Sequence, residues 1–166
     1  FAGRGKTVIE NDETARDMME ITRTTSERLF DFTFALARKR KEQGKPGIVT
    51  CVDKANVLGS LAFFRKVFDE RAALNPDLDA RHGYVDAVSM TFVRNPWIYD
   101  VLVTENMFGD ILSDIGAGLM GGLGFAPSAD IGEKQAVFQP CHGTAPDIAG
   151  KGLANPTAMV LSAAMM

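Results

Sequence analysis

The chain has 166 residues, 46% hydrophobic content and a formal net charge of −3. A chain of this length can form one ordinary domain and bury about two thirds of its unfolded surface, which is typical of a globular protein. No stretch approaches the roughly 18 consecutive apolar residues that a membrane-spanning helix needs. We therefore expect a cytoplasmic protein without a secretory leader, and one that acts on neither membranes nor nucleic acid.

The cysteines and the two ends of the chain bear on its setting. Cys51 and Cys141 are too few and too far apart for a disulfide framework, so we expect two reduced, buried thiols. The chain begins at Phe1 and stops at Met165-Met166 inside an apolar, helix-like run. These ends predict a piece of a longer protein.

The first part of the chain alternates helical and extended segments. Residues 12–43 have a helical period, with a start capped by Asn11 or Asp12 and an end at Gly44 and Pro46. The predicted buried face comprises Met18, Ile21, Thr25, Leu29, Phe32 and Leu36. A β-rich run follows at 48–52, and then a second helix that ends at Asn75-Pro76. The predicted buried stripe of that helix comprises Leu61, Phe64, Phe68 and Ala72.

The alternation continues toward the C-terminus and predicts an α/β layer architecture. Tyr84-Val85-Asp86 is predicted as a strand end, residues 87–94 as a short helix, 101–104 as a strand and 105–120 as a helix. Five glycines between 116 and 124, ahead of Pro127, end that helix. We place a domain boundary near residue 121, followed by two short strands and a final helix that starts near Pro156.

Residues 116–121 match the dinucleotide-binding pattern G-x-G-x-x-G. That pattern binds a pyrophosphate only when it leaves a strand and opens a helix, whereas here it closes a predicted helix. We therefore reject a Rossmann fold.

The basic run at residues 38–41 could suggest nucleic-acid binding. It falls in the last turns of a predicted helix, where cations face the negative end of the helix macrodipole. No aromatic platform accompanies it, so a solvated helix end is the better interpretation.

Asp110 and Asp114 are four residues apart on a predicted helix and share one of its faces. Spacing alone leaves two interpretations open. The first is a pair of solvated carboxylates, and the second is a site for Mg²⁺ or Mn²⁺, which prefer oxygen ligands.

Lys54 directly follows the β-rich run, at the edge of the sheet where α/β proteins place their chemistry. A lysine that is shielded from water and near other cations has a lowered pKa and can carry a proton near neutral pH. The alternatives are a surface lysine and, for Asp53, a carboxylate that pairs with Lys54 or caps the next turn.

The segment Cys141-His142-Gly143-Thr144-Ala145-Pro146-Asp147 lacks the spacing of a zinc site. Its composition is that of a loop that could wrap around a nucleotide without a glycine-rich helix start.

Together these segments resemble the β-decarboxylating dehydrogenases, the family of 3-isopropylmalate, isocitrate and tartrate dehydrogenases. The resemblance covers nearly the whole chain, in type, order and spacing. It is carried by residues 52–57, 84–86, 106–114, 142–150 and 154–156. It implies an isocitrate/isopropylmalate dehydrogenase-like α/β fold, truncated at its N-terminal side, with a dimerising domain at 1–120 and an incomplete cofactor-binding domain at 121–166.

The resemblance also implies roles for individual residues. Asp110 and Asp114 would bind Mg²⁺ or Mn²⁺ with Asp86 from the partner chain of a homodimer. Lys54 would reach across the dimer to relay a proton, and Asn56 would lie near substrate and nicotinamide. The NAD-binding residues would be His142, Gly143, Thr144, Ala145, Pro146, Asp147 and Asn155.

The implied reaction is the oxidation of a 2-hydroxy acid with NAD, followed by loss of its β-carboxylate as CO₂. Asp147 favours NAD, because NADP-using isocitrate dehydrogenases of the family tend to carry a lysine there, followed by a tyrosine where this chain has Ile148. The family's substrate-binding arginines and its tyrosine lie upstream, and Arg4 and Arg23 do not stand in those motifs. We therefore expect this chain by itself to be inactive, as part of a longer active dehydrogenase. The alternative is that it is a non-catalytic dimerisation core left from such an enzyme.

Overall fold

The computed structural model describes residues 7–166, which divide into two compact units. The first unit ends at Asp110 and the second comprises Ile111–Met166. The division falls inside helix α4 (Asn106–Leu119), upstream of the glycine-rich stretch. The assignment of 1–120 to a dimerising domain and of 121–166 to an incomplete cofactor domain stays a prediction. Arg4 lies outside the described residues.

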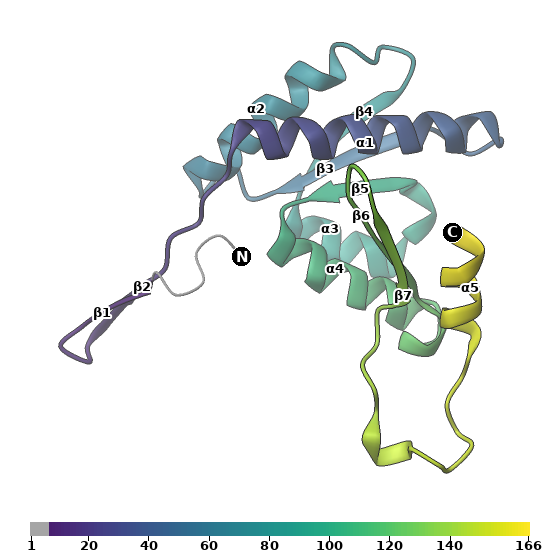
Figure 1. Cartoon of the computed structure of the whole chain (residues 1–166). Coiled ribbons are helices and arrows are strands. Elements are labelled where there is room, and N and C mark those ends of the chain that lie inside the picture. Colours follow the sequence, from purple (N-terminus) through teal and green to yellow (C-terminus); the bar gives the residue numbers. More distant parts are fainter. Residues whose placement is uncertain (1–6) are drawn as a thin grey trace. The chain divides into compact units, whose positions relative to one another are not determined.

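A parallel three-stranded sheet forms the centre of the first unit (Figure 1). Its strands, in the spatial order β4-β3-β5, are β3 (Ile48–Asp53), β4 (Asp79–Tyr84) and β5 (Val101–Thr104). Helices connect the strands, which confirms the predicted α/β class. One local prediction was wrong, because Tyr84 ends its strand but Val85 and Asp86 already belong to helix α3 (Val85–Arg94).

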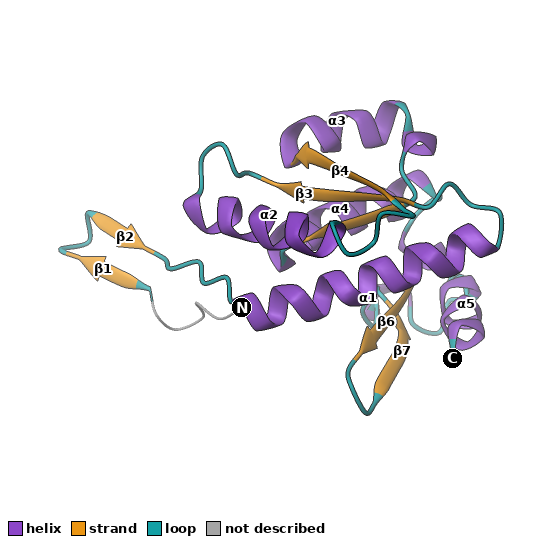
Figure 2. Cartoon of the chain, turned by 90° about the horizontal axis from the view of Figure 1, so that it is seen from above, coloured by secondary structure: helices purple, strands orange, loops and turns teal. Residues whose placement is uncertain are grey.

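Helices cover both faces of this sheet (Figure 2). Helices α1 (Arg23–Glu42) and α2 (Gly59–Ala72) pack on one face and α3 packs on the other. The core under α1 and α2 includes Phe30, Phe34, Val49, Cys51, Leu61, Phe64 and Phe68. This confirms the predicted burial of Leu61, Phe64 and Phe68. On the other face, a Cβ added to Gly83 would lie 2.4 Å from Val88 Cγ2, so the strand backbone and α3 are in close contact.

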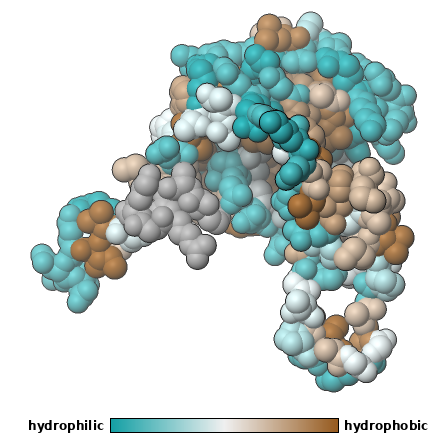
Figure 3. All heavy atoms as spheres, viewed as in Figure 1, coloured by the Kyte–Doolittle hydropathy of each residue, from teal (hydrophilic) through white to brown (hydrophobic). Residues whose placement is uncertain are grey.

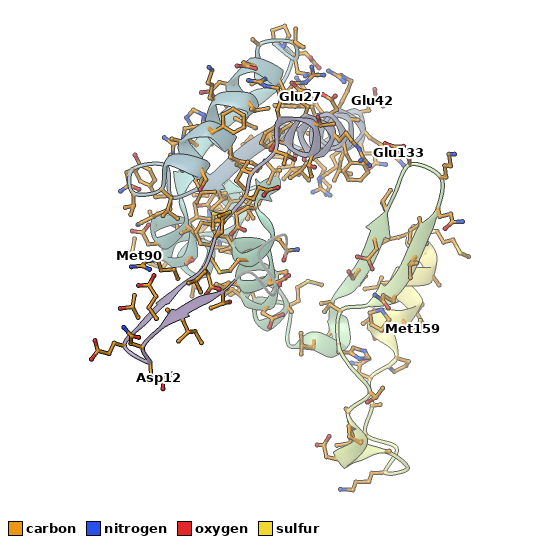
Figure 4. The ribbon with its side chains drawn as sticks, turned by 60° about the vertical axis from the view of Figure 1, so that its left-hand side comes forward. Asp12, Glu27, Glu42, Met90, Glu133 and Met159 are labelled. Atoms are coloured by element: carbon orange, nitrogen blue, oxygen red, sulfur yellow. The ribbon has the colours of Figure 1, made fainter. Side chains whose placement is uncertain are left out.

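The start of helix α1 differs from its prediction. Residues 8–16 form a hairpin of β1 (Val8–Glu10) and β2 (Thr14–Arg16), and the helix begins only at Arg23. Asn11 and Asp12 do not cap the helix, because they form the turn of the hairpin, with φ of 53° and 55° (Figure 4 labels Asp12 at the tip). Asn and Asp tolerate this left-handed backbone better than other side chains do, which explains why they form a tight turn here.

The buried face of α1 also differs from its prediction. The buried residues are Ser26, Phe30, Thr33, Phe34 and Ala37. Leu29, Phe32 and Leu36, which were assigned to the core, are 36%, 46% and 39% exposed. The helix has apolar residues on two adjacent stripes, and the stripe that meets the phenylalanines of α2 is buried. The Ser26 and Thr33 hydroxyls donate to the carbonyls of Thr22 and Leu29, at 2.8 Å each, so their burial leaves no hydroxyl unpaired.

The end of α1 agrees with its prediction. Gly44 has a φ of +82° and lies just beyond the last two turns of the helix, which contain the basic run at residues 38–41. Arg38 pairs with Asp77 at 3.0 Å and Arg40 with Asp100 at 2.6 Å. Part of the basic run therefore binds carboxylates of the same unit.

The second unit contains an antiparallel hairpin of β6 (Pro127–Ile131) and β7 (Ala136–Pro140). Helix α5 (Thr157–Met165) packs against it, and the Ser128 amide donates to the buried Ser162 hydroxyl at 3.3 Å. The two predicted short strands and the final helix are thus confirmed. Among residues 7–166, no helix is both long enough and apolar enough to cross a bilayer.

The glycine motif at residues 116–121 lies in the last turns of α4 and just beyond it. Gly121 and Gly122 have φ values of 109° and 125°, which other residues rarely adopt, and they end the helix. The motif therefore closes a helix instead of opening one, as predicted, so it lacks the strand-to-helix context of a dinucleotide fingerprint.

Candidate active site

The carboxyl ends of β3 and β4 bring several predicted residues together. Asp53 and Tyr84 are the last residues of the two strands and are partners in the parallel register. Lys54 directly follows β3, and Asp86 lies in the first turn of α3. The sheet therefore places Lys54 and Asp86, which are 32 residues apart in sequence, at one edge.

Lys54 and Asp86 form an ion pair, with the Lys54 Nζ 2.5 Å from the Asp86 Oδ1. The Lys54 side chain is 27% exposed and that of Asp86 is 67% exposed, so the pair opens to the surface. The hydrogen bond from Lys54, together with backbone N–H groups of Asp86 and Ala87, holds the pKa of Asp86 below its ordinary value. The Lys54 Nζ also lies 6.0 Å from the centroid of the Tyr84 ring.

Asp53 does not pair with Lys54, which corrects one of the two interpretations offered for it. Its buried carboxylate accepts two hydrogen bonds from Arg65 of α2, at 2.7 Å each, and one from the Ala55 amide at 2.8 Å. The second interpretation, a cap for the following turn, is confirmed. A buried charge is stable only when it is paired and fully hydrogen-bonded, and Arg65 meets this need.

The importance of Arg65 was not predicted, because no sequence motif contains it. It is one of several charged residues on α2, and its partner Asp53 lies 12 positions upstream on a different element. Only the packing of α2 on the sheet brings the two together.

Asn56 lies in the turn between β3 and α2 and is exposed. The Lys54 carbonyl accepts hydrogen bonds from the amides of Val57 and Leu58, at 3.0 and 2.9 Å. The turn therefore presents an exposed Asn56 close to Lys54.

Helix α4 carries the two other predicted metal ligands. Glu105 precedes the helix and its carboxylate accepts hydrogen bonds from the amides of Met107 and Phe108, at 2.9 and 2.8 Å. This cap favours the helix start at Asn106. Asp110 and Asp114 follow, both exposed and separated by about one helical turn.

The donor atoms of these three aspartates are carboxylate oxygens, which suit Mg²⁺ and Mn²⁺. Within residues 7–166 of one chain, no three acidic, histidine or cysteine side chains come together as a metal site. The chemistry of the donors therefore fits the metal.

The predicted nucleotide loop connects β7 to α5 and extends away from them (Figure 1). Its backbone is irregular, with a short 3₁₀ helix at Pro146–Ile148 and a left-handed Ala145 at φ 44°. Gly143, Thr144 and Asp147 are exposed, and a Cβ on Gly143 would meet no atom within 4 Å. The loop is thus an open surface with a carboxylate available for hydroxyl groups.

The two other polar residues predicted to bind NAD, His142 and Asn155, already have contacts. The His142 Nδ1 lies 2.9 Å from the Gly143 carbonyl, and the Asn155 Oδ1 accepts the Thr157 amide at 3.0 Å, at the start of α5. The Asn155 side-chain NH₂ is not used by that bond. Cys141 is exposed, which corrects its predicted burial, whereas Cys51 is buried as expected.

The sequence matches the isocitrate/isopropylmalate dehydrogenase family over residues 1–166. The chain belongs to this family. It is 53% identical over 147 residues to the 3-isopropylmalate/3-methylmalate dehydrogenase of Methanocaldococcus jannaschii, a match that covers 88% of the chain and 44% of that protein. It is 49% identical over 156 residues to the 3-isopropylmalate dehydrogenase of Bacillus cereus, covering 93% of the chain and 43% of that protein.

Solved structures give the same result. The isocitrate dehydrogenase of Methylococcus capsulatus superimposes with a TM-score of 0.86 at 46% identity, covering 95% of the chain and 46% of that structure. The apo β-decarboxylating dehydrogenase of Thermococcus kodakarensis has a TM-score of 0.84 at 41% identity, with 96% and 46% covered. The isocitrate/isopropylmalate dehydrogenase-like fold is therefore confirmed. The chain spans less than half the length of these relatives.

Proposed function

We propose that the full-length protein is an NAD-linked, metal-dependent dehydrogenase that oxidises 3-isopropylmalate and removes its β-carboxylate as CO₂. The observation that carries this proposal is the 53% and 49% identity to two 3-isopropylmalate dehydrogenases over about nine tenths of the chain. Tartrate, malate or isocitrate are the next candidate substrates. The 166-residue chain alone is proposed to be inactive, because the family's substrate-binding arginines and tyrosine lie in motifs that this sequence does not contain.

Bound NAD would supply the hydride acceptor, and a bound Mg²⁺ or Mn²⁺ would supply the positive charge that favours the alkoxide and the enolate. Asp110 and Asp114 would hold the ion together with Asp86. Lys54 would relay the proton of the substrate hydroxyl, and Asn56 would contact substrate and nicotinamide. The loop at 142–147, with Asn155, would hold the adenosine half of NAD.

In a homodimer with shared sites, Asp86 of one chain would complete the metal site of Asp110 and Asp114 in the other. Lys54 and Asp86 already form an ion pair within one chain, so they can enter a partner's site together. Helices α3 and α4 each expose apolar side chains, with Met90 and Val93 both 55% exposed and Ile111 51% exposed (Figure 4 labels Met90). Exposed apolar surface of this kind favours contact with another chain.

Mixed dimers of full-length protein test the shared site. A Lys54→Ala chain and an Asp110→Ala chain should each be inactive as homodimers, with 3-isopropylmalate, NAD and Mn²⁺ supplied. After subunit exchange, one of the two sites in each heterodimer receives an intact Asp110 from one chain and an intact Lys54 from the other. Activity should then return to about half the wild-type value per heterodimer, because in a symmetric dimer one site is intact and the other carries both substitutions.

The wild-type protein and native mass spectrometry are the controls for this experiment. If heterodimers form and the mixture stays inactive, Lys54 and Asp110 act in the same chain and the shared-site model is wrong. A wild-type protein that oxidises none of the hydroxy acids would instead refute the proposed reaction.

A further inference from the structure

The carboxylate of Asp53 is a buried charged group close to the candidate site. It is fully buried, and its two oxygens accept hydrogen bonds from the Arg65 Nε and Nη2 atoms and from the Ala55 amide. The Arg65 side chain is 23% exposed. Paired, parallel hydrogen bonds between a guanidinium and a carboxylate fix both groups in direction as well as distance.

A second contact ties Arg65 to the neighbouring strand. The Arg65 Cζ lies 5.0 Å from the centroid of the Tyr84 ring, and the Lys54 Nζ lies 6.0 Å from the same centroid. Tyr84 is in register with Asp53 at the ends of the parallel strands. Arg65 therefore contacts the last residues of both β3 and β4. Lys54 directly follows the first of these strands, and Asp86 lies two residues beyond the end of the second.

The consequence of this arrangement is local order in the turn that carries Lys54. Three hydrogen bonds hold this turn. The Ala55 amide donates to the Asp53 carboxylate, and the Val57 and Leu58 amides donate to the Lys54 carbonyl. A lysine side chain has four flexible carbons, so the direction of its ammonium group depends on a fixed backbone. The hydrogen bond from the Ala55 amide to Asp53 contributes to that fixed backbone, and Arg65 holds the carboxylate that accepts it.

We propose that Arg65 is a positioning residue that acts through Asp53 to hold the turn at residues 54–58, and with it Lys54, in the geometry that proton relay requires. This inference rests on the proposed function for its catalytic consequence. Asp53 is fully buried and both its oxygens are occupied, so the pair acts on the turn and not on the substrate.

The test compares Arg65→Met with Arg71→Gln in the full-length protein. Arg71 is a matched control, because it lies on the same helix and also pairs with a carboxylate of another element, Asp31, at 2.5 Å. Amide hydrogen exchange of the peptide covering 54–58 should be about tenfold faster in Arg65→Met, since one hydrogen bond in the turn loses its anchored acceptor. It should be unchanged in Arg71→Gln.

Kinetics with 3-isopropylmalate, NAD and Mn²⁺ give the second readout. Arg65→Met should lower kcat roughly 10- to 100-fold, because small misplacement of a catalytic group has effects of that size. The KM should stay within about threefold, since Lys54 would act on the reacting proton more than on substrate binding. Arg71→Gln should retain the wild-type kcat.

Arg65→Lys addresses the possibility that Arg65→Met does not fold. It keeps a positive charge beside Asp53 but lacks the paired donors, so it should show a several-fold loss of kcat and intermediate exchange at 54–58. Wild-type exchange at 54–58 in a folded Arg65 variant would overturn the inference, as would accelerated exchange with a wild-type kcat. If the wild-type protein lacks the proposed activity, the proposed function fails separately and the exchange data decide whether Arg65 orders the turn.

Discussion

The two cysteines show how the surroundings of a side chain set its chemistry. Cys51 is in the core beneath α1 and α2, where burial and then the charge of Asp53 raise the pKa of its thiol. Cys141 is exposed at the end of the β6–β7 hairpin. Because the thiolate is the reactive form, these two sites should differ strongly in reactivity.

We expect a maleimide to label Cys141 and to leave Cys51 unlabelled in the folded protein at mildly alkaline pH. The raised pKa leaves almost no thiolate at Cys51, and the core also excludes the reagent. Peptide mass spectrometry after a timed reaction would measure both sites. Cys141→Ser should remove the fast labelling, and denaturant should then expose Cys51. Equal labelling of the two cysteines without denaturant would contradict the burial of Cys51.

Asp53 and Asp86 are two carboxylates near one sheet edge with opposite surroundings. Asp53 is buried and bound by Arg65, whereas Asp86 is 67% exposed in its side chain and bound by Lys54. The exposed carboxylate can exchange its partner for a ligand, but the buried one cannot without leaving an unpaired charge in the core. This difference favours Asp86 as a metal ligand and Asp53 as a structural group.

At the scale of elements, helix α1 shows which of two apolar stripes a core selects. Phe30 lies 4.6 Å from Phe64 and 5.3 Å from Phe68, measured between ring centroids, and all three rings are at most 2% exposed. Phe32, two residues along the helix, is 46% exposed. Aromatic pairs at these separations stabilise a core beyond their buried area.

Truncation of Phe30 and of Phe32 to alanine should therefore change the free energy of unfolding by very different amounts. We expect Phe30→Ala to lower the free energy of unfolding by about 3–5 kcal/mol, because it opens a cavity among packed rings. Phe32→Ala, its matched control on the same helix, should cost less than about 1 kcal/mol. Urea unfolding of the full-length protein, followed by circular dichroism, would measure both. A larger loss for Phe32→Ala would mean that another surface covers the Phe32 stripe.

Apolar side chains are also exposed on the β1–β2 hairpin, where Val8 is 54% and Ile9 is 65% exposed (Figure 3). All six residues of the two strands are exposed. Two-stranded hairpins are marginal in water by themselves, so the local turn at Asn11 and Asp12 has to direct the pairing.

At the scale of the whole molecule, the exposed carboxylate of Asp147 bears on the choice of cofactor. We expect the full-length enzyme to use NAD with a kcat/KM at least about tenfold higher than that for NADP. A carboxylate can accept hydrogen bonds from ribose hydroxyls, but it repels a 2′-phosphate by at least about 1 kcal/mol at contact distance. Steady-state kinetics with both cofactors would measure the ratio. Asp147→Asn should bring the kcat/KM ratio of NAD to NADP closer to one. Equal kcat/KM values for the two cofactors in the wild type would refute the predicted preference for NAD.

Much of this fold could be predicted from the sequence because the patterns are local. The strand at 101–104 agrees with its prediction at both ends, and α2 buries three of its four predicted positions. The glycines at 121 and 122 end α4 through their own backbone conformation. The order and spacing of the motifs also predicted the family, since they depend on residue types alone.

Only the tertiary structure decided which neighbours these residues have. The predicted buried face of α1 contained Phe32, but packing against α2 buried the adjacent stripe, which contains Phe30. Asp53 could have paired with the adjacent Lys54, but parallel pairing of β3 with β4 placed Asp86 within reach of that lysine, and packing of α2 brought Arg65 to Asp53. Such pairings join segments far apart in sequence, so their partners are set by strand register and helix packing, which residue patterns do not encode locally.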